Sequence, residues 1–369
     1  MVVPVGLVGG IIWWALHVQK RRNAAWQALA ARLGLSFAPG SVWGMLDGQL
    51  VQLRIEVRGS GKHKQTWTVA TGMLQPPLDL GLGVTPQGLL SSLGRLFGAQ
   101  DVPLGDPAFD DAFVIKADEP ARAATLLSPQ LRAVLLQLRA NGSGFSFSDA
   151  GGQIERRGGV DDAVWLEWAV KTVALLARLA SEARAFVPCA APLAVHRDAW
   201  LGYARDAGLT GMDTPLCIWG RMQEASVSAY SVRVGPMLHR LEVFVRFDAP
   251  LAMGLVVRPQ GALDGLAALF GGQDHATGDR PFDGAFVVKA TTAGQVSEVL
   301  DGEVRRRLLE MSARGFVPQI RDDGVTVRAP SFPPDPSEVP RILADAKAAA
   351  RAIVQNATRR AAGGIGPYR

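Results

Sequence analysis

The segment Gly105–Ala117 reads GDPAFDDAFVIKA, and Gly278–Ala290 repeats it as GDRPFDGAFVVKA. The offset between the two copies is 278 − 105 = 173, and it holds without a gap outside the motif. Between Pro77 and Leu136, 28 of 60 positions are identical in sequence to the position 173 further on. Unrelated segments would agree at roughly one position in fifteen. The chain is therefore an internal duplication, which predicts two similar domains.

Both copies predict the same order of elements. A helix comes first, followed by alternating apolar and polar runs typical of antiparallel strands, such as Gln49–Val57 and Gln65–Met73. The strand of the motif, an amphipathic helix and a hairpin come next, and a long helix ends each copy, at Asp161–Ala185 and Ser337–Ala357. The sequence predicts an α+β fold of two tandem domains, each an antiparallel sheet packed with helices.

The N-terminal stretch MVVPVGLVGGIIWWALHV has no charged side chain unless His17 is protonated. As a helix it would span roughly 27 Å, close to the ~30 Å hydrocarbon core of a bilayer. Trp13 and Trp14 lie towards its end, where interfacial aromatic residues are favoured, and the basic run 20–22 follows at once. A cleaved signal peptide would carry its positive charge before the apolar run. The order predicts one uncleaved transmembrane helix, with its N-terminus outside and the bulk of the chain in the cytoplasm.

The membrane-interface residues of this anchor would be Trp13, Trp14, Lys20, Arg21 and Arg22. The alternative is a buried N-terminal helix of the first domain, because Gly9 and Gly10 and the short length weaken a membrane span.

Five segments follow from these patterns. The linker should be exposed around Pro188 and Pro192, and the last residues should form a frayed basic tail. The predicted segments are a membrane anchor and basic stop at 1–22, a first α+β repeat at 23–185, the linker at 186–195, a second repeat at 196–357 and the tail at 358–369.

Composition excludes several classes of protein. The 369 residues are 48% hydrophobic and carry a net charge of +5, and basic residues alternate with acidic ones along most of the chain. A dedicated nucleic-acid binder would concentrate its positive charge, so nucleic acid is an unlikely partner. Cys189 and Cys217 occupy non-equivalent places in the two copies and predict no disulfide framework. The histidines are scattered, and no phosphate-binding loop or nucleophile elbow is present, so no metal, cofactor or catalytic residue is predicted.

The duplicated motif places two aspartates four positions apart in each copy: Asp106 and Asp110, then Asp279 and Asp283. Paired carboxylates could bind a divalent cation or act as acid and base. They could equally accept backbone N–H bonds in a Gly-Asp turn. Only this motif offers a candidate acidic site, and both interpretations stay open from the sequence.

The motif strand, followed by a helix with paired leucines and a hairpin, resembles a module of bacterial domains of unknown function that often follow N-terminal membrane helices. The similarity covers Gly105–Glu155 and Gly278–Arg328. It implies a protein of the bacterial inner membrane and brings no catalytic residue with it.

Three functions follow as hypotheses. The first is a membrane-anchored, cytosol-facing binding or scaffolding protein without catalytic activity, whose partners are the membrane and another protein. The second is an enzyme with a carboxylate-lined groove between the repeats. The third is a binder of anionic lipid or nucleic-acid surfaces.

Overall fold

The computed structural model divides the chain into two compact units, unit 1 (Met1–Pro188) and unit 2 (Cys189–Arg369). The division lies inside the predicted linker. The structure describes the chain except for residues 1–4, 60–62, 89–99, 143, 223–224, 236–237, 250, 252, 261–272, 291–293, 295, 334–335 and 364–369, and except for the side chains of 5–15, 100–101, 273–274 and 360–363.

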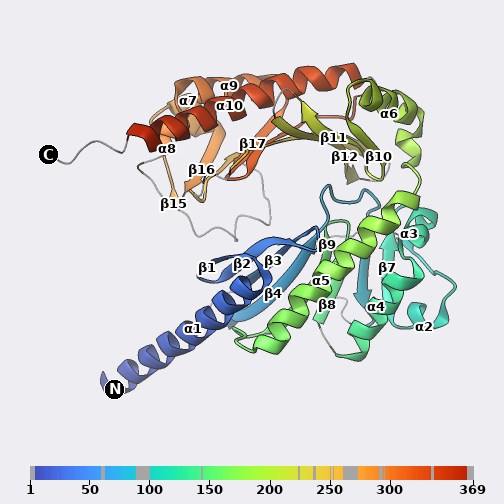
Figure 1. Cartoon of the computed structure of the whole chain (residues 1–369), viewed down its shortest axis with the longest axis vertical. Helices are drawn as coiled ribbons and strands as arrows, with labels where there is room; N and C mark the ends of the chain where they lie inside the picture. Colours follow the sequence, from blue (N-terminus) through green and yellow to red (C-terminus); the bar gives the residue numbers. More distant parts are fainter. Residues whose placement is uncertain are drawn as a thin grey trace. The chain divides into compact units, whose positions relative to one another are not determined.

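Unit 1 combines one antiparallel sheet with helices packed on it (Figure 1). Its described strands form a nine-stranded sheet in the order β1-β2-β3-β4-β9-β8-β5-β7-β6. The helices are α1 (Val5–Leu33), α2 (Pro107–Asp110), α3 (Pro120–Leu126), α4 (Pro129–Ala140) and α5 (Ala163–Ala183). The strands are β1 (Ser36–Ala38), β2 (Ser41–Leu46), β3 (Gln49–Arg58), β4 (Gln65–Met73), β5 (Gly83–Pro86), β6 (Gln100–Asp101), β7 (Phe113–Ala117), β8 (Gly144–Ser148) and β9 (Gly151–Arg157).

Unit 2 repeats this architecture. Its described strands form the sheet β10-β11-β12-β13-β18-β17-β14-β16-β15, which is the order of unit 1 element by element. The helices are α6 (Arg197–Asp206), α7 (Arg280–Ala285), α8 (Val296–Val299), α9 (Gly302–Ala313) and α10 (Val339–Gly363). The strands are β10 (Thr210–Asp213), β11 (Leu216–Met222), β12 (Ala225–Gly235), β13 (Leu238–Arg246), β14 (Val256–Pro259), β15 (Gln273–Asp274), β16 (Phe286–Ala290), β17 (Val317–Arg321) and β18 (Gly324–Arg328). The predicted α+β class and the two similar domains are confirmed.

The first helix of each unit ends at a glycine for the same physical reason. Gly34 and Gly208 follow α1 and α6 with φ of 67° and 66°, a left-handed conformation that glycine adopts without a steric penalty. The N–H of Leu35 then donates to the carbonyl of Ala30 at 2.8 Å, as a C-cap requires. This turn directs the chain from the helix into the first strand of the sheet.

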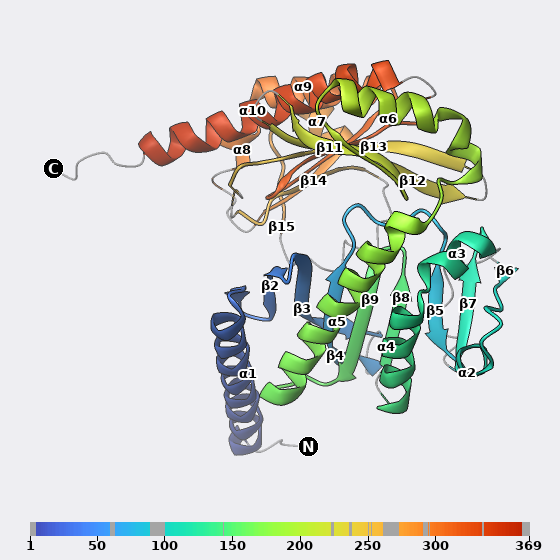
Figure 2. The same cartoon turned by 45° about the vertical axis from the view of Figure 1, so that its right-hand side comes forward.

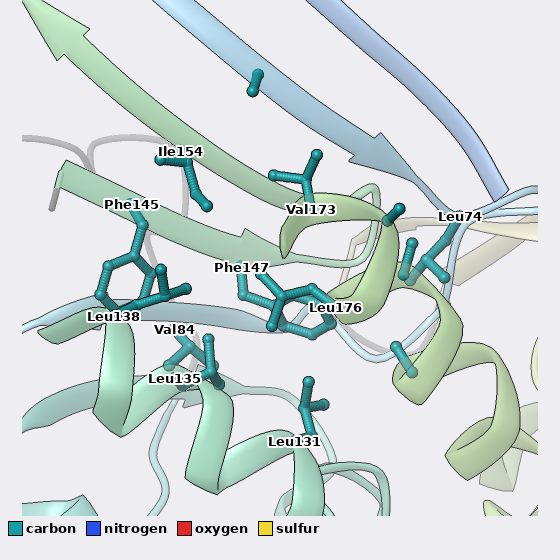
Figure 3. Close-up of a cluster of buried hydrophobic side chains, with 14 of the residues drawn as sticks. Leu74, Val84, Leu131, Leu135, Leu138, Phe145, Phe147, Ile154, Val173 and Leu176 are labelled. Carbon is teal, nitrogen blue, oxygen red and sulfur yellow. The ribbon is translucent and has the colours of Figure 1, made fainter. Parts of the chain in front are cut away.

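The long final helix covers the centre of each sheet. In unit 1, α5 packs against β3, β4 and β9 (Figures 1 and 2). Figure 3 shows Val173 and Leu176 of α5 beside Phe147 and Ile154 of the β8–β9 hairpin, with leucines of α4 completing the cluster. Strand residues alternate between this core and the opposite face, so the apolar and polar alternation predicted from the sequence becomes the two faces of the sheet.

The N-terminal segment forms part of α1, which runs unbroken from the predicted anchor into the first repeat. Within the described residues, no helix combines the length and the apolar character that a bilayer crossing needs. The predicted transmembrane helix is therefore not found in the structure. The predicted anchor begins at Met1, and residues 1–4 and the side chains of 5–15, including Trp13 and Trp14, lie outside the description.

Two details of the predicted segments need correction. The linker 186–195 is only partly exposed: Pro188 is exposed, but Pro192 is half-buried. Val187 belongs to the core of unit 1 and Leu193 to that of unit 2. The basic tail does not fray at 358, because α10 continues to Gly363, and residues 364–369 lie outside the description. Apolar side chains tie each part of the linker to its own unit. The residues after 357 include the good helix formers arginine and alanine and no proline before the helix ends at Gly363.

Candidate functional site

The duplicated motif begins with a capped turn. Gly105 has a φ of 72°, and Asp106 is the N-cap of α2, where its carboxylate accepts from the N–H of Phe109 at 3.3 Å. Pro107 occupies the first helical position, which suits its fixed φ and missing N–H. In unit 2, Asp279 caps α7 in the same way, with the N–H of Phe282 at 3.3 Å. The first aspartate of each pair is thus a helix cap.

The second aspartate of each pair closes the same turn from the other side. Asp110 accepts from the N–H of Leu104 and of Gly105, both at 3.0 Å. Asp283 accepts from the N–H of Thr277 at 2.9 Å and of Gly278 at 3.0 Å, and from the Thr277 hydroxyl at 2.7 Å. Partial burial opposes the charge of Asp283, but the bonds from Thr277 and Gly278 outweigh it, so the pKa of Asp283 is lowered.

One arginine joins each turn to the neighbouring helix. Arg132 of α4 lies 2.9 Å from Asp106, and Arg305 of α9 lies 3.1 Å from Asp279. The two arginines are related by the same offset of 173 (305 − 132), so the ion pair is duplicated together with the turn. All four candidate carboxylates therefore have local partners. Within the described part of the chain, no group of three or more His, Cys, Asp or Glu side chains could hold a metal ion.

The phenylalanines of the motif fasten these turns to the core. Phe109 and Phe113 are buried with ring centroids 4.5 Å apart, and Phe145 of β8 meets Phe113 at 5.6 Å. Phe282 and Phe286 stack at 4.8 Å in unit 2. The motif is a turn whose aromatic side chains fold back over the strand that follows it.

A second pair of aspartates holds the loop before β5 and β14. Asp149 accepts from the N–H groups of Leu80, Gly81 and Leu82 at 3.3, 2.8 and 3.1 Å. In unit 2, Asp322 accepts from Gly254 and Leu255, each at 2.8 Å. Sequence reasoning missed both residues, although an aspartate shared at the offset of 173, two residues before a shared glycine, was a usable signal.

Unit 1 also contains a buried ion pair. Arg122 lies 2.7 Å from Asp79, and the two side chains are 4% and 0% exposed. Arg122 also contacts Glu119 at 2.9 Å and donates to the carbonyl of Pro188 in the linker at 2.8 Å. Asp79 also influences the carboxylate of Asp149. Desolvation raises the pKa of the partly buried Asp149 to about 7, and the charge of Asp79 adds to this rise. The three backbone N–H donors lower the pKa of Asp149 and so act against it. At the offset of 173, Asp79 and Arg122 correspond to Ala252 and Gln295, so the pair is not duplicated.

The sheet face opposite the core helices is polar. In unit 1, Arg58 contacts Glu56 at 2.8 Å and Glu155 at 2.7 Å, and Arg54 also contacts Glu56. Trp43 on neighbouring β2 is 40% exposed. In unit 2, Glu242 accepts from the hydroxyl of Tyr230 at 2.6 Å and pairs with Arg328 at 2.8 Å. Burial, together with Glu242, raises the pKa of Tyr230. These faces carry charged and aromatic groups.

The structure describes only some of the predicted membrane-interface residues. The side chains of Trp13 and Trp14 lie outside it, whereas those of Lys20, Arg21 and Arg22 lie inside it. Arg21 pairs with Asp161 at 3.1 Å, which ties α1 to the start of α5.

A comparison with protein-family models, characterised proteins and solved structures finds no match to this chain. The resemblance of the motif to bacterial membrane-associated domains therefore stays a prediction.

Proposed function

We propose that this chain is a membrane-attached binding or scaffolding protein that acts without catalysis, with both α+β units on the cytoplasmic side of a bacterial inner membrane. The observation that carries the absence of catalysis is the use of the motif carboxylates. In both copies, Asp106 and Asp279 cap helices and pair with arginines, while Asp110 and Asp283 accept backbone N–H bonds. Carboxylates bound to their own turns are structural groups.

Attachment to the membrane is supported by the sequence. Met1–Val18 is apolar, and the basic residues at 20–22 follow it directly, an order that retains the following chain in the cytoplasm. Binding to a protein partner is supported by the polar faces of the two sheets. The enzyme hypothesis has no favouring observation in the described residues.

The attachment can be tested with the full chain in a bacterial host. After alkaline carbonate washing, the wild-type protein should stay in the membrane pellet, and a reporter fused after Arg369 should be active only inside the cell. Exchanging Ile11 and Ile12 for lysine places two charges in the apolar stretch, each costing ~2.5–3.5 kcal/mol at the centre of a span, and should release the chain. Val164→Lys/Val195→Lys adds the same two charges at side chains 80% and 81% exposed outside the stretch; it is the matched control and should not release the chain. Release of the wild type by carbonate would overturn the attachment.

The structural role of the carboxylates needs a separate measurement. The melting temperature of the full chain in detergent should not respond to added Mg²⁺, Ca²⁺ or Mn²⁺, because the carboxylates are already bonded. A rise in the wild type that disappears in Asp106→Asn would instead make these residues ligands, since binding to the folded state alone stabilises it.

A further inference from the structure

At one end of unit 1, three segments bring basic side chains together. The first is α1, where it continues from the N-terminal apolar stretch. The guanidinium of Arg22 lies 6.0 Å from the centre of the Trp26 ring, and the Trp26 indole N–H donates to the carbonyl of Val160 at 2.9 Å. A Cβ added at Gly159 would lie 3.2 Å from the guanidinium of Arg22. The basic run of α1 therefore lies directly against the loop between β9 and α5.

The same loop is fastened to β4. The N–H of Gly158 donates to the carbonyl of Thr66 at 2.8 Å, and the N–H of Val160 donates to the hydroxyl of Thr68 at 2.9 Å. In the sheet, Arg157 of β9 is opposite Trp67 of β4. The β3–β4 hairpin continues past this point, with Arg58 opposite Gln65. The end of β9 and the β3–β4 hairpin thus lie at the same end of unit 1 as residues 20–22.

We define the basic rim as the described lysines and arginines of these three segments. Acidic side chains at the same end reduce its charge: Asp161 pairs with Arg21 at 3.1 Å and Asp162 with Arg156 at 3.3 Å. Arg58 also contacts Glu56 at 2.8 Å and Glu155 at 2.7 Å. Within the described residues, the exposed side chains of Lys20, Lys64 and Arg157 take part in no ion pair. The members of the rim are Lys20, Arg21, Arg22, Arg58, Lys64, Arg156 and Arg157.

The second unit does not repeat the basic pair at the end of β9. At the offset of 173, Arg156 and Arg157 correspond to Ala329 and Pro330. Only the unit that continues from the apolar N-terminal stretch carries the basic pair at the end of this strand. The common fold therefore does not require this basic pair.

We propose that the basic rim binds the headgroups of anionic phospholipids at the surface that α1 enters. The proposal rests on the membrane attachment proposed above, because the apolar stretch would bring the rim to that surface. Basic residues close to a transmembrane helix on the cytoplasmic side are attracted by anionic lipids over about a Debye length. The rim has the matching charge and adjoins the segment that would enter the bilayer.

The test uses the full chain reconstituted in phosphatidylcholine membranes that contain a trace of spin-labelled phosphatidylglycerol or phosphatidylcholine. The spectrum separates lipids immobilised by the protein from bulk lipid, so the ratio of the two labels measures the preference for the anionic headgroup. We expect a preference on the order of fivefold that declines as salt is added. In Lys64→Gln/Arg156→Gln/Arg157→Gln the ratio should fall to about one, because three positive charges of the rim are removed. Of these three side chains, Arg156 also loses its ion pair with Asp162.

A matched control removes the same number of positive charges from exposed positions in unit 2, with Arg280→Gln/Arg341→Gln/Arg351→Gln. This variant should keep the preference, and all three proteins should keep the same circular dichroism spectrum. Equal association of both lipids with the wild type would overturn the proposal. So would an equal loss in the control, because the preference would then follow net charge alone.

Two further results distinguish a failure of the membrane attachment from a failure of the rim proposal. If carbonate strips the chain from the membranes while the salt-sensitive preference for phosphatidylglycerol persists, the attachment fails and the rim proposal holds. If the chain resists carbonate without preferring the anionic lipid, the rim proposal fails alone. Adding a short single-stranded RNA should leave the preference unchanged; an RNA that abolishes it and binds the wild type but not the triple variant would assign the rim to nucleic acid and overturn the proposal.

Discussion

At one contact between the sheet and its long helix, units 1 and 2 place the smaller and the larger residue on opposite sides. In unit 1, glycines stand on the sheet and large residues on the helix: Gly152 on β9 lies under Leu176 on α5. A Cβ added at Gly152 would approach the Leu176 Cδ1 atom to 2.8 Å. In unit 2, at the offset of 173, the sheet residue is the buried Val325 and the helix residue is the buried Ala349.

The neighbouring position differs in its cause. A Cβ at Gly72 on β4 would lie 2.0 Å from the backbone carbonyl oxygen of Val173, so the glycine allows the close approach of the helix backbone. The corresponding residues in unit 2 are Val245 and Ala346. Exchanging a small and a large residue across one contact keeps the packed volume nearly constant. At the contact of Gly152 with Leu176 the two units therefore retain nearly the same packed volume although both residues have changed.

Other features of the two units were kept or lost as whole clusters. The capped turn with its aspartates and arginine occurs in both, whereas the Asp79–Arg122 ion pair occurs in unit 1 alone. Each difference can be tested by substituting residues in one unit and measuring the unfolding of the full chain in detergent by calorimetry. The unfolding transition of the other unit then serves as the internal reference.

The largest effect should come from the aromatic residues that both units share. Phe113→Ala and Phe286→Ala each remove a buried ring from its core, and such truncations typically cost ~3–5 kcal/mol. Each variant should lower the transition temperature of its own unit by a similar amount and leave the other transition in place. If only one of the two substitutions lowered the transition temperature of its own unit, the two motifs would not be equivalent.

Arg122→Gln should be nearly as damaging, and only unit 1 can show the effect. It removes the guanidinium from beside an Asp79 carboxylate that stays buried, and breaking a buried ion pair in this way costs ~3–5 kcal/mol. The double variant Asp79→Ala/Arg122→Gln installs the residues found at the corresponding positions of unit 2. It should unfold at a higher temperature than Arg122→Gln alone, because no buried carboxylate then loses its guanidinium. A double variant less stable than the single one would contradict this account.

An intermediate effect is expected at the exchanged packing pair. Gly152→Val should destabilise unit 1 by ~1–3 kcal/mol, because the new side chain overlaps Leu176. Leu176→Ala alone should also destabilise, by leaving a cavity. Together the two changes reproduce the pair Val325 and Ala349, and residues in contact typically couple by ~0.5–3 kcal/mol. The double variant should therefore be more stable than the sum of the single effects predicts, and strict additivity would show that the exchange is not compensatory.

Much of the fold could be predicted from the sequence because its signals are local. The strand predicted from the alternation in Gln65–Met73 has the same bounds as β4, and the strand predicted at Phe286–Ala290 has those of β16. The partners of the side chains could not be predicted, because they come from distant segments: Asp149 meets a loop 67 to 69 residues earlier in the chain. The sequence left two interpretations open for Asp106 and Asp110, a turn and a metal site, because the same spacing of aspartates can occur in both.

The smallest effect should come from the carboxylates that first suggested a site. Asp106→Asn keeps an oxygen that can accept from the N–H of Phe109 but removes the charge that pairs with Arg132. An N-cap Asn is about as favourable as Asp, and a partly exposed ion pair contributes ~0–1 kcal/mol, so the loss should not exceed ~1 kcal/mol. Asp106→Ala also removes the cap bond and should cost ~0.5–2 kcal/mol more. Because Asp279 has the same two partners, Asp279→Asn and Asp279→Ala should give the same two values in unit 2. A loss at either aspartate that exceeds the loss at Phe113 would reverse the ranking and require a contribution from these carboxylates beyond the turns they cap.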